Sequence, residues 1–322
     1  MTKTKTPKTF EDGLAESNVA RANMIARFGF VPLSVIREIH RGKLHRRMFV
    51  YQSEEAGRAA NNWTLEKALE EAPTEAWKEK IVARSKRPGT MNIPPKSMQN
   101  KNRAQLSMMP AELVEFFVKY YAKPGDVYLD PFMGQGIQLQ VAKLLGLHYY
   151  GYDLSTEFFR YIDSVRSKID DGKTVLNITN GDSRFPSNIP DGIGDFSFHS
   201  PPYWDIEFYG EESGQLGHGQ TYEEFLVGMR DVARAWLPKF KPGAFHIINV
   251  NDFRRDGRFY SYHSDTIRIF VDAGWELFDT WIIEGLVGGF PKVFAVQHNN
   301  NKTSPKVHEY ALVFRKPGGK GR

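Results

Sequence analysis

From residue 106 onward, short apolar runs rich in β-branched and aromatic residues alternate with stretches of helical period. Strands separated by crossover helices are typical of a mostly parallel sheet with helices on both faces. The seven strand-like runs are Val127–Leu129, Leu147–Tyr152, Thr174–Ile178, Phe196–His199, Ala244–Val250, Trp275–Ile283 and Tyr310–Phe314. The helical stretches are Ala111–Tyr121, Ile137–Leu145, Glu157–Lys168, Tyr222–Trp236 and Asp265–Ala273. The sequence therefore predicts an α/β fold, a doubly wound and mostly parallel sheet of seven strands, whose ligands bind outside the carboxyl ends of the strands.

The N-terminal third differs from the rest of the chain in its charge. Residues 1–103 hold 20 Lys and Arg against 11 Asp and Glu, whereas residues 104–322 hold 23 against 27. Ile36, Ile39, Leu44 and Met48 fall near helical spacing, and residues 84–105 are rich in Pro, Asn and basic side chains. We therefore expect a basic, mainly helical region over residues 1–105 and a second domain over residues 106–322. The basic excess indicates either a polyanionic partner or a solvated basic surface.

The composition excludes several classes of function. The 322 residues include no Cys, so disulfides, thiolate zinc sites and thiol nucleophiles are excluded. No apolar run approaches the roughly 18 residues that span a bilayer, and residues 1–10 lack the apolar core of a signal peptide. His199, His246 and His308 are not spaced as a metal triad. We expect a cytoplasmic protein that binds neither a membrane nor a metal; nothing in the sequence predicts its oligomeric state.

The first strand runs into a glycine-containing turn, Asp130-Pro131-Phe132-Met133-Gly134-Gln135-Gly136, and then into a helix. A pair of glycines at such a turn lets a ligand approach the backbone closely. The dinucleotide fingerprint would need a small residue where Leu139 stands, and the Gly-Lys-Ser/Thr of the P-loop is absent. Asp130 would repel a phosphate but could pair with an ammonium or sulfonium group. The turn therefore favours a cationic ligand group over a phosphate.

Two more carboxylates follow the next two strands. Asp153 ends the second strand, 19 residues beyond Gly134, and Asp182 follows the third. A carboxylate at the end of the second strand commonly accepts hydrogen bonds from ribose hydroxyls. Each aspartate taken alone is compatible with a helix cap or a turn residue. Three in succession at one edge of the sheet favour a nucleoside ligand.

The fourth strand ends in Ser200-Pro201-Pro202-Tyr203. Two prolines remove two backbone donors and fix the backbone, so the carbonyls of this turn are rigidly held acceptors. Tyr203 adds a flat aromatic face. The arrangement suits a planar substrate with an exocyclic amine, because the carbonyls and the serine hydroxyl can accept its N–H groups while the ring stacks.

These two turns together resemble the cofactor and catalytic motifs of the S-adenosylmethionine-dependent amino-methyltransferases of DNA. The resemblance covers about residues 105–316, including the preceding segment Ser107–Leu113 and the closing strand from Lys306 to Lys316. It implies a Rossmann-like methyltransferase fold. The general layout, including the region near residues 32–47, is also similar to that of methylases often carried by phages and mobile elements.

The resemblance implies roles for individual residues. On the cofactor side, Phe132, Gly134 and Gly136 would shape the methionine pocket, with Pro110 from the preceding segment. Asp130 would lie near the ammonium, Asp153 would bind the ribose hydroxyls, and Asp182 would lie near the adenine amine. Ser200, Pro201, Pro202 and Tyr203 would hold the target amine and stack the base, which must leave the duplex.

Base recognition must lie outside the 63-residue interval between Gly136 and Ser200, which is too short for a large recognition insert. The candidates are the loops Asp205–Gln220 and Gly285–Pro305 and the basic N-terminal region, where Arg41, Lys43, Arg46 and Arg47 are the expected contacts to double-stranded DNA.

The sequence excludes one methylation reaction and leaves several alternatives open. Methylation at cytosine C5 needs a thiolate, which the absence of Cys excludes. In the family that the chain resembles, Ser before Pro-Pro-Tyr is commoner among N4-cytosine enzymes, whereas Asp or Asn is commoner among N6-adenine enzymes. We therefore expect N4-cytosine methylation, with N6-adenine as the alternative. An RNA guanine amino-methyltransferase and a non-catalytic nucleic-acid-binding homologue remain further alternatives.

Overall fold

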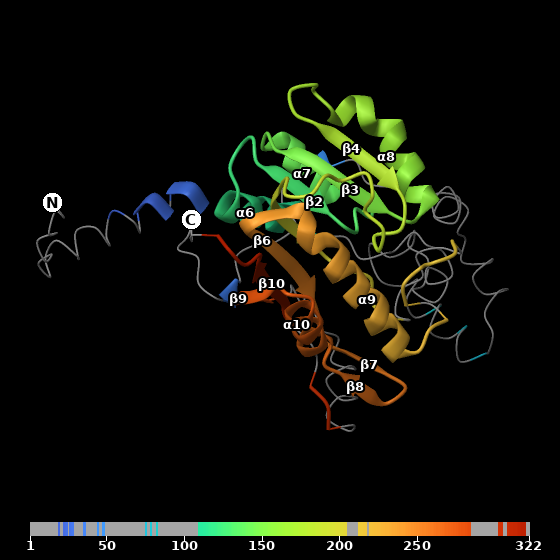
Figure 1. Ribbon diagram of the computed structural model, residues 1–322. Coiled ribbons are helices and arrows are strands. Elements are labelled where there is room, and N and C mark those ends of the chain that lie inside the picture. Colours follow the sequence, from blue (N-terminus) through green and yellow to red (C-terminus); the bar gives the residue numbers. More distant parts are fainter. Residues whose placement is uncertain are drawn as a thin grey trace, which may run out of the picture.

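The computed structural model describes residues 19, 22–24, 26–28, 35–36, 44, 47–48, 75, 78, 82, 109–204, 212–217, 219–284, 302–304 and 308–319. Its centre is an eight-stranded sheet in the order β1-β9-β10-β6-β5-β2-β3-β4 (Figure 1). The strands are β1 (Val35–Ile36), β2 (Val127–Asp130), β3 (His148–Asp153), β4 (Leu176–Asn180), β5 (Gly194–His199), β6 (Phe240–Val250), β9 (Glu276–Glu284) and β10 (His308–Arg315). Of these strands, only β10 runs antiparallel to its neighbours, β6 and β9. The predicted mostly parallel α/β sheet is confirmed.

The helices between these strands lie on both faces of the sheet. They are α6 (Ala111–Tyr121), α7 (Ile137–Leu144), α8 (Thr156–Ile169), α9 (Tyr222–Trp236) and α10 (Tyr262–Asp272). The predicted bounds of α6 and α9 agree with the structure, and α9 begins at a capping box in which Thr221 and Glu224 exchange hydrogen bonds. The described helices include none long and apolar enough to cross a membrane.

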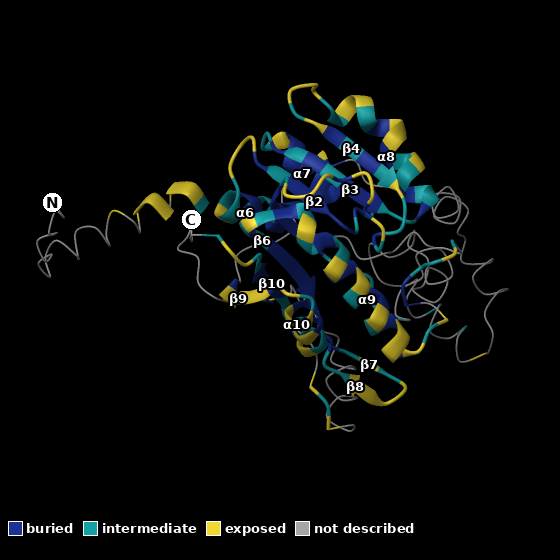
Figure 2. Ribbon diagram, in the orientation of Figure 1, coloured by how far each residue is buried: buried dark blue, intermediate teal, exposed yellow. Residues whose placement is uncertain are grey.

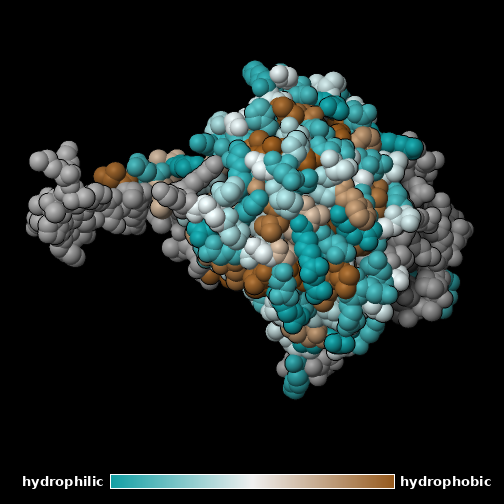
Figure 3. All heavy atoms as spheres, viewed as in Figure 1, coloured by the Kyte–Doolittle hydropathy of each residue, from teal (hydrophilic) through white to brown (hydrophobic). Residues whose placement is uncertain are grey.

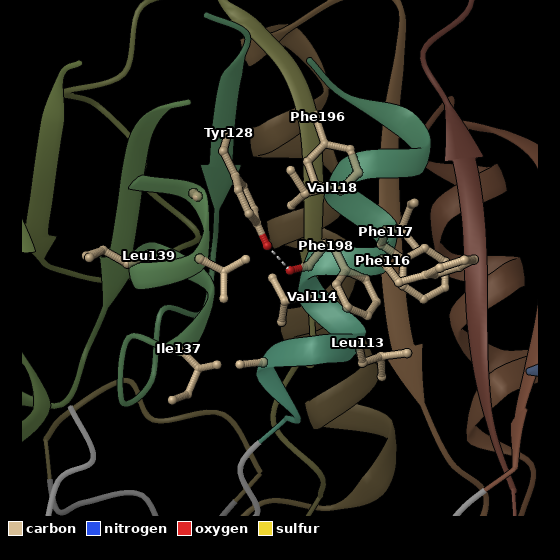
Figure 4. Packing of buried hydrophobic residues seen from close by; sticks show 14 of the residues in the cluster. Leu113, Val114, Phe116, Phe117, Val118, Tyr128, Ile137, Leu139, Phe196 and Phe198 are labelled. Atoms are coloured by element: carbon tan, nitrogen blue, oxygen red, sulfur yellow. Dashed lines mark hydrogen bonds between the residues drawn. The ribbon is translucent and has the colours of Figure 1, made fainter. Parts of the chain in front are cut away.

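Alternate residues of the central strands enter two separate cores. In β2, Tyr128 packs in the core formed with α6 and α7, whereas Leu129 packs in the core formed with α9 and α10. Figure 4 shows the first of these cores, in which the Tyr128 hydroxyl donates a hydrogen bond to the Phe198 carbonyl. The strands are consequently buried on both sides (Figure 2), as expected of a sheet covered by helices on both faces.

The strand order reverses at the centre of the sheet. From β2, the chain continues outward through β3 and β4, and then returns to β5 on the other side of β2. The two parallel strands β2 and β5 are hydrogen-bonded neighbours, so their following turns leave the sheet side by side. Such a reversal opens a crevice at the carboxyl ends of the strands, which is where the two sequence motifs are found.

The structure corrects the sequence prediction in two places. Ile36 was expected in a helix, but Val35–Ile36 forms β1, which pairs with β9 and becomes the eighth strand. The wrong assignment arose because an apolar spacing near 3.6 residues also occurs by chance in short strands. The second difference is a hairpin that was not predicted, β7 (Phe253–Arg255) and β8 (Arg258–Tyr260), which follows β6.

Some described residues of the N-terminal third pack against α6. The Phe28 ring lies 5.5 Å from that of Phe116, and the Leu44 amide donates to Glu112 Oε1 at 2.9 Å. Ile36 is 1% exposed within the first core. The remainder of the predicted helical region lies largely outside the described residues, and the division at residue 105 stays a prediction.

Candidate active site

A cavity of about 370 Å³ lies at the carboxyl edge of the sheet. Ligand pockets commonly have volumes of this order or larger. Both sequence motifs contribute to its wall. Of the predicted site residues, those that line it are Pro110, Phe132, Gly134, Asp153, Asp182, Ser200, Pro201, Pro202 and Tyr203.

The two glycines of the first turn have different tasks. Gly134 lines the cavity with φ at +52°, and a Cβ placed there would meet no atom within 4 Å. Gly136 has φ at +77° and precedes α7, where a Cβ would lie 2.3 Å from Ile162 Cδ1 of α8. Gly134 therefore leaves backbone open to a ligand, whereas Gly136 permits close packing beneath the turn and does not line the cavity.

Asp130 does not line the cavity either. Its side chain is fully buried, and its carboxylate accepts hydrogen bonds from the Tyr149 hydroxyl at 2.7 Å and from the Phe132 amide at 3.1 Å. Burial raises the pKa of Asp130 to about 7. The carboxylate therefore holds the start of the glycine turn. Because Asp130 does not reach the cavity, the predicted contact between its carboxylate and a ligand ammonium would need an intervening group.

Asp153 links the first two strand ends. Its Oδ2 accepts the Gly134 amide at 2.7 Å and its Oδ1 accepts the Ser155 amide at 2.8 Å. Burial raises the pKa of this carboxyl to about 6, and the two backbone hydrogen bonds act in the opposite direction. Each carboxylate oxygen has a further lone pair, so Asp153 can accept ligand hydroxyls while it holds the glycine turn.

Asp182 is paired with a neighbouring cation. Both of its oxygens accept Arg184 Nε at 3.0 Å, and Oδ2 lies 2.5 Å from Arg184 Nη2. The same guanidinium donates to the Gly214 carbonyl at 3.2 Å. The ion pair thereby connects the third strand end to Gly214, which also lines the cavity.

The proline turn presents fewer free carbonyls than the sequence suggested. The Pro202 carbonyl accepts the Tyr262 hydroxyl at 3.3 Å, and the Tyr203 side chain hydrogen-bonds with the Ser200 side chain and the Asn251 backbone. Burial raises the pKa of Tyr203 well above its ordinary value. The hydroxyl of Tyr203 is therefore neutral and held in place, which fixes the orientation of its ring beside Ser200 and Pro201.

Sequence reasoning missed a polar wall beside this turn. Asn249 near the end of β6 donates through Nδ2 to Glu309 Oε2 of β10 at 2.7 Å, and both residues line the cavity with Asn251. The Oδ1 atoms of Asn249 and Asn251 are buried without a hydrogen-bond partner among the described residues. The available signal was the cluster of polar residues, Asn249, Asn251 and Asp252, at the end of an apolar strand.

Two histidines that are not spaced with His308 as a metal triad, His199 and His246, are buried in the structure. His199 and His246 approach through their Nε2 atoms at 2.7 Å, and burial lowers the pKa of His199 to about 3. The pKa of His246 is also lowered, first by burial and then by His199. Among the residues that the structure describes, no group of three or more His, Asp or Glu side chains could hold a metal ion.

Most of the predicted DNA contacts cannot be placed. Arg41, Lys43 and Arg46 lie outside the described residues, whereas Arg47 is described and exposed. The loops Asp205–Gln220 and Gly285–Pro305 are described only over 212–217, 219–220 and 302–304.

Residues 18–164 match the family model described as DNA methylase, of the N6/N4 methyltransferase type. The matched range includes the glycine turn and Asp153 and extends well into the N-terminal third. A curated relative, the Type II methyltransferase M1.MboII of Moraxella bovis, is 33% identical over 61 residues, which are 19% of this chain and 24% of the relative. Over residues 18–164 the chain is therefore similar to DNA methylases of the N6/N4 class.

Solved structures also resemble parts of this chain. The DNA modification methylase TTHA0409 of Thermus thermophilus, solved with S-adenosyl-L-methionine, is 27% identical, covers 44% of this chain and 54% of its own, and has a TM-score of 0.33. TrmN of Thermus thermophilus is 18% identical, covers 84% of this chain and 80% of its own, and has a TM-score of 0.45. The chain thus matches about a quarter of the curated relative and about half of the TTHA0409 structure.

Proposed function

We propose that this protein transfers a methyl group from S-adenosylmethionine to the exocyclic amine of a DNA base, with N4 of cytosine as the preferred target. One observation carries the proposal: the glycine turn after β2 and the Ser-Pro-Pro-Tyr turn after β5 open into the same cavity. A methyl group can pass directly between two ligands only if both sites share one space. Separate crevices would have been incompatible with this reaction.

The residues at the cofactor side fit a nucleoside with a cationic amino-acid tail. Asp153 offers acceptors for ribose hydroxyls, and Gly134 leaves backbone exposed to the tail. Gln135 Oε1 is buried without a hydrogen-bond partner among the described residues, and Gln135 lines the cavity. An ammonium group would satisfy that acceptor, a task that the sequence assigned to Asp130. When bound, S-adenosylmethionine supplies a methyl group on a positively charged sulfur.

The proline turn makes the exocyclic amine of the target base more nucleophilic. The lone pair of an exocyclic amine is conjugated into the ring, so the nitrogen is a weak nucleophile. The Ser200 hydroxyl and the Pro201 carbonyl accept its N–H groups, which draws the nitrogen toward tetrahedral geometry and localises the lone pair. Tyr203 stacks on the base. The base leaves the duplex at a cost of a few kcal/mol, which the pocket contacts offset.

The same contacts serve adenine, so N6-adenine methylation is the alternative. Ser200 before the prolines favours cytosine by resemblance to N4-cytosine enzymes. The substrate that we propose is double-stranded DNA, methylated in the cytoplasm of a bacterium or a phage-infected cell.

The test is to incubate the protein with duplex DNA of mixed sequence and cofactor labelled in its methyl group, and then to digest the DNA to nucleosides. Label in N4-methyl-2′-deoxycytidine supports the proposal, and label in N6-methyl-2′-deoxyadenosine supports the alternative. Label only in guanine of a parallel RNA sample would overturn the DNA assignment. No transfer, together with no cofactor affinity in calorimetry, would indicate a non-catalytic binding protein.

A further inference from the structure

The hairpin β7–β8 follows β6 and extends beyond the carboxyl end of that strand (Figure 1). Its two strands are joined by Asp256 and Gly257, with φ at +49° and +77°. Both values are those that a two-residue turn of the tight hairpin type requires. The turn fixes the register, so Phe253 faces Tyr260 and Arg255 faces Arg258.

One face of this hairpin is bound to the proposed catalytic turn. The Phe253 and Tyr260 rings stack at 5.3 Å, Tyr260 lies 5.1 Å from Trp204, and Phe253 lies 6.3 Å from Tyr203. Phe253 also lines the cavity. The hairpin is therefore packed as an extension of the wall that holds the target base.

Two arginines lie on the same face of the hairpin as Phe253 and Tyr260. Residues two apart on a strand share a face, so Arg255 and Arg258 lie beyond Phe253 and Tyr260 on the side that contacts the catalytic turn. Arg258 stacks over the Tyr260 ring at 5.0 Å, and Arg255 Nε lies 3.5 Å from the exposed Asp256 carboxylate. Like charges directly opposite each other destabilise an antiparallel pair. Figure 3 shows hydrophilic side chains over this end of the molecule.

We propose that Arg255 and Arg258 form a phosphate clamp that binds the DNA backbone beside the everted nucleotide. A phosphate between the two guanidinium groups removes their repulsion and accepts hydrogen bonds from both. The backbone of an everted nucleotide must pass the rim of the cavity, and the hairpin leads from Phe253, which lines the cavity, to the two arginines. Contacts of this kind position DNA without reading its sequence, so base recognition lies elsewhere. This inference rests on the proposed function, because it takes DNA as the substrate.

The third arginine of the hairpin provides a matched control. Arg254 faces Phe259, over whose ring its guanidinium lies at 5.1 Å, and therefore occupies the opposite face. Arg254→Gln removes the same charge from the same hairpin. Lys173→Gln, at an exposed site before β4 and thus at the amino edge of the sheet, is a distant control.

The experiment measures binding of a duplex oligonucleotide by the cofactor-loaded protein at several salt concentrations. Arg255→Gln and Arg258→Gln should each weaken binding about tenfold near 0.1 M salt and lower the slope of log K against log salt by about 1. Arg254→Gln and Lys173→Gln should change both quantities far less. Replacement of both clamp residues by Lys should retain most of the slope.

Two further measurements separate the clamp from a structural role. Without DNA, Arg255→Gln should leave the thermal midpoint and the cofactor affinity nearly unchanged, because the relieved repulsion from Arg258 and the lost pairing with the exposed Asp256 act in opposite directions. Wild-type methylation of DNA combined with an unchanged salt slope in both Gln variants would overturn the clamp while leaving the proposed function intact. A larger slope change with single-stranded RNA than with duplex DNA would also overturn it. Absence of any DNA methylation by the wild-type protein would instead count against the proposed function.

Discussion

The Asp153 carboxylate accepts the Gly134 amide at 2.7 Å and thereby ties the end of β3 to the glycine turn that follows β2. One side chain thus shapes the turn and presents acceptors to the cavity. The same coupling means that removal of this carboxylate changes the turn and deletes a ligand acceptor at once.

Asp153→Ala should weaken S-adenosylmethionine binding by at least tenfold, since a hydrogen bond to a charged group contributes about 1.5–3 kcal/mol. Isothermal titration calorimetry measures the affinity. Asp163→Ala, at an exposed site on α8, is the control and should bind as the wild type does. Equal affinity in the two variants would exclude Asp153 from the cofactor site.

Ser200→Ala should lower the rate of methyl transfer about a hundredfold or more, because the variant lacks an acceptor aligned with the reacting amine. Cofactor affinity should remain nearly intact, since Ser200 belongs to the proline turn after β5 and not to the glycine turn or to Asp153. Single-turnover kinetics with labelled cofactor gives the first quantity and calorimetry the second. A large fall in cofactor affinity would mean that the two subsites have been assigned to the wrong turns.

Asp130→Asn should stabilise the protein more at pH 8 than at pH 5. Burial raises the pKa of Asp130 to about 7, above the value of about 3.9 expected in an unfolded chain. The folded state therefore binds more protons between about pH 4 and 7, and its stability falls as the pH rises through this window. The Asn variant is free of this destabilisation, which amounts to about 1.4 kcal/mol for each pKa unit crossed. Denaturant unfolding at both pH values measures the effect, with Asp163→Asn as the exposed control. An equal change in the free energy of unfolding between the two pH values in both variants would contradict this reasoning.

Gly136→Ala should reduce the free energy of unfolding by about 1–3 kcal/mol, because the methyl group meets Ile162 and the residue has positive φ. Gly172→Ala is the matched control, since φ is +70° there but no atom lies within 4 Å of the added Cβ. It should cost less, through backbone strain alone. Equal destabilisation in the two variants would show that Ile162 yields without cost.

Arg46→Gln combined with Arg47→Gln should weaken DNA binding and flatten its salt dependence, by a slope of about 1 for each phosphate that is no longer neutralised. Lys168→Gln with Lys173→Gln removes the same charge at exposed sites near the amino edge of the sheet. If the arginine pair and the lysine pair have the same small effect, the N-terminal region does not bind DNA.

The elements that sequence patterns identified best are those whose signals are local. The Thr221 capping box marks the start of α9, and the apolar period of Ala111–Tyr121 marks α6. The Asp256-Gly257 pair is an equally local signal for the hairpin, which the strand prediction did not include. Val35–Ile36 could not be found this way, because a two-residue strand exists only through its pairing with β9.

The polar wall of the cavity depends on a pairing between distant segments. Tyr310 pairs with Val250 across β10 and β6, which brings Glu309 to Asn249 although 60 residues separate them. Neither Glu309 nor Asn249 belongs to a sequence motif that would have identified it. The position of Asp130 is decided in a similar way, since its partner Tyr149 lies 19 residues away on the neighbouring strand.

The sequence by itself determined the alternation of strands and helices, the carboxyl-edge position of the two turns, and the residues available to a cofactor and an amine. These features follow from period, from proline and glycine chemistry and from the direction of parallel strands, all of which are local. Only the tertiary structure decided that both turns share one cavity, that Asp130 is buried outside its lining, and that Arg255 and Arg258 face each other across a hairpin. Those relationships depend on strand order and register, which arise from packing across the whole sheet and leave no mark within a short segment of sequence.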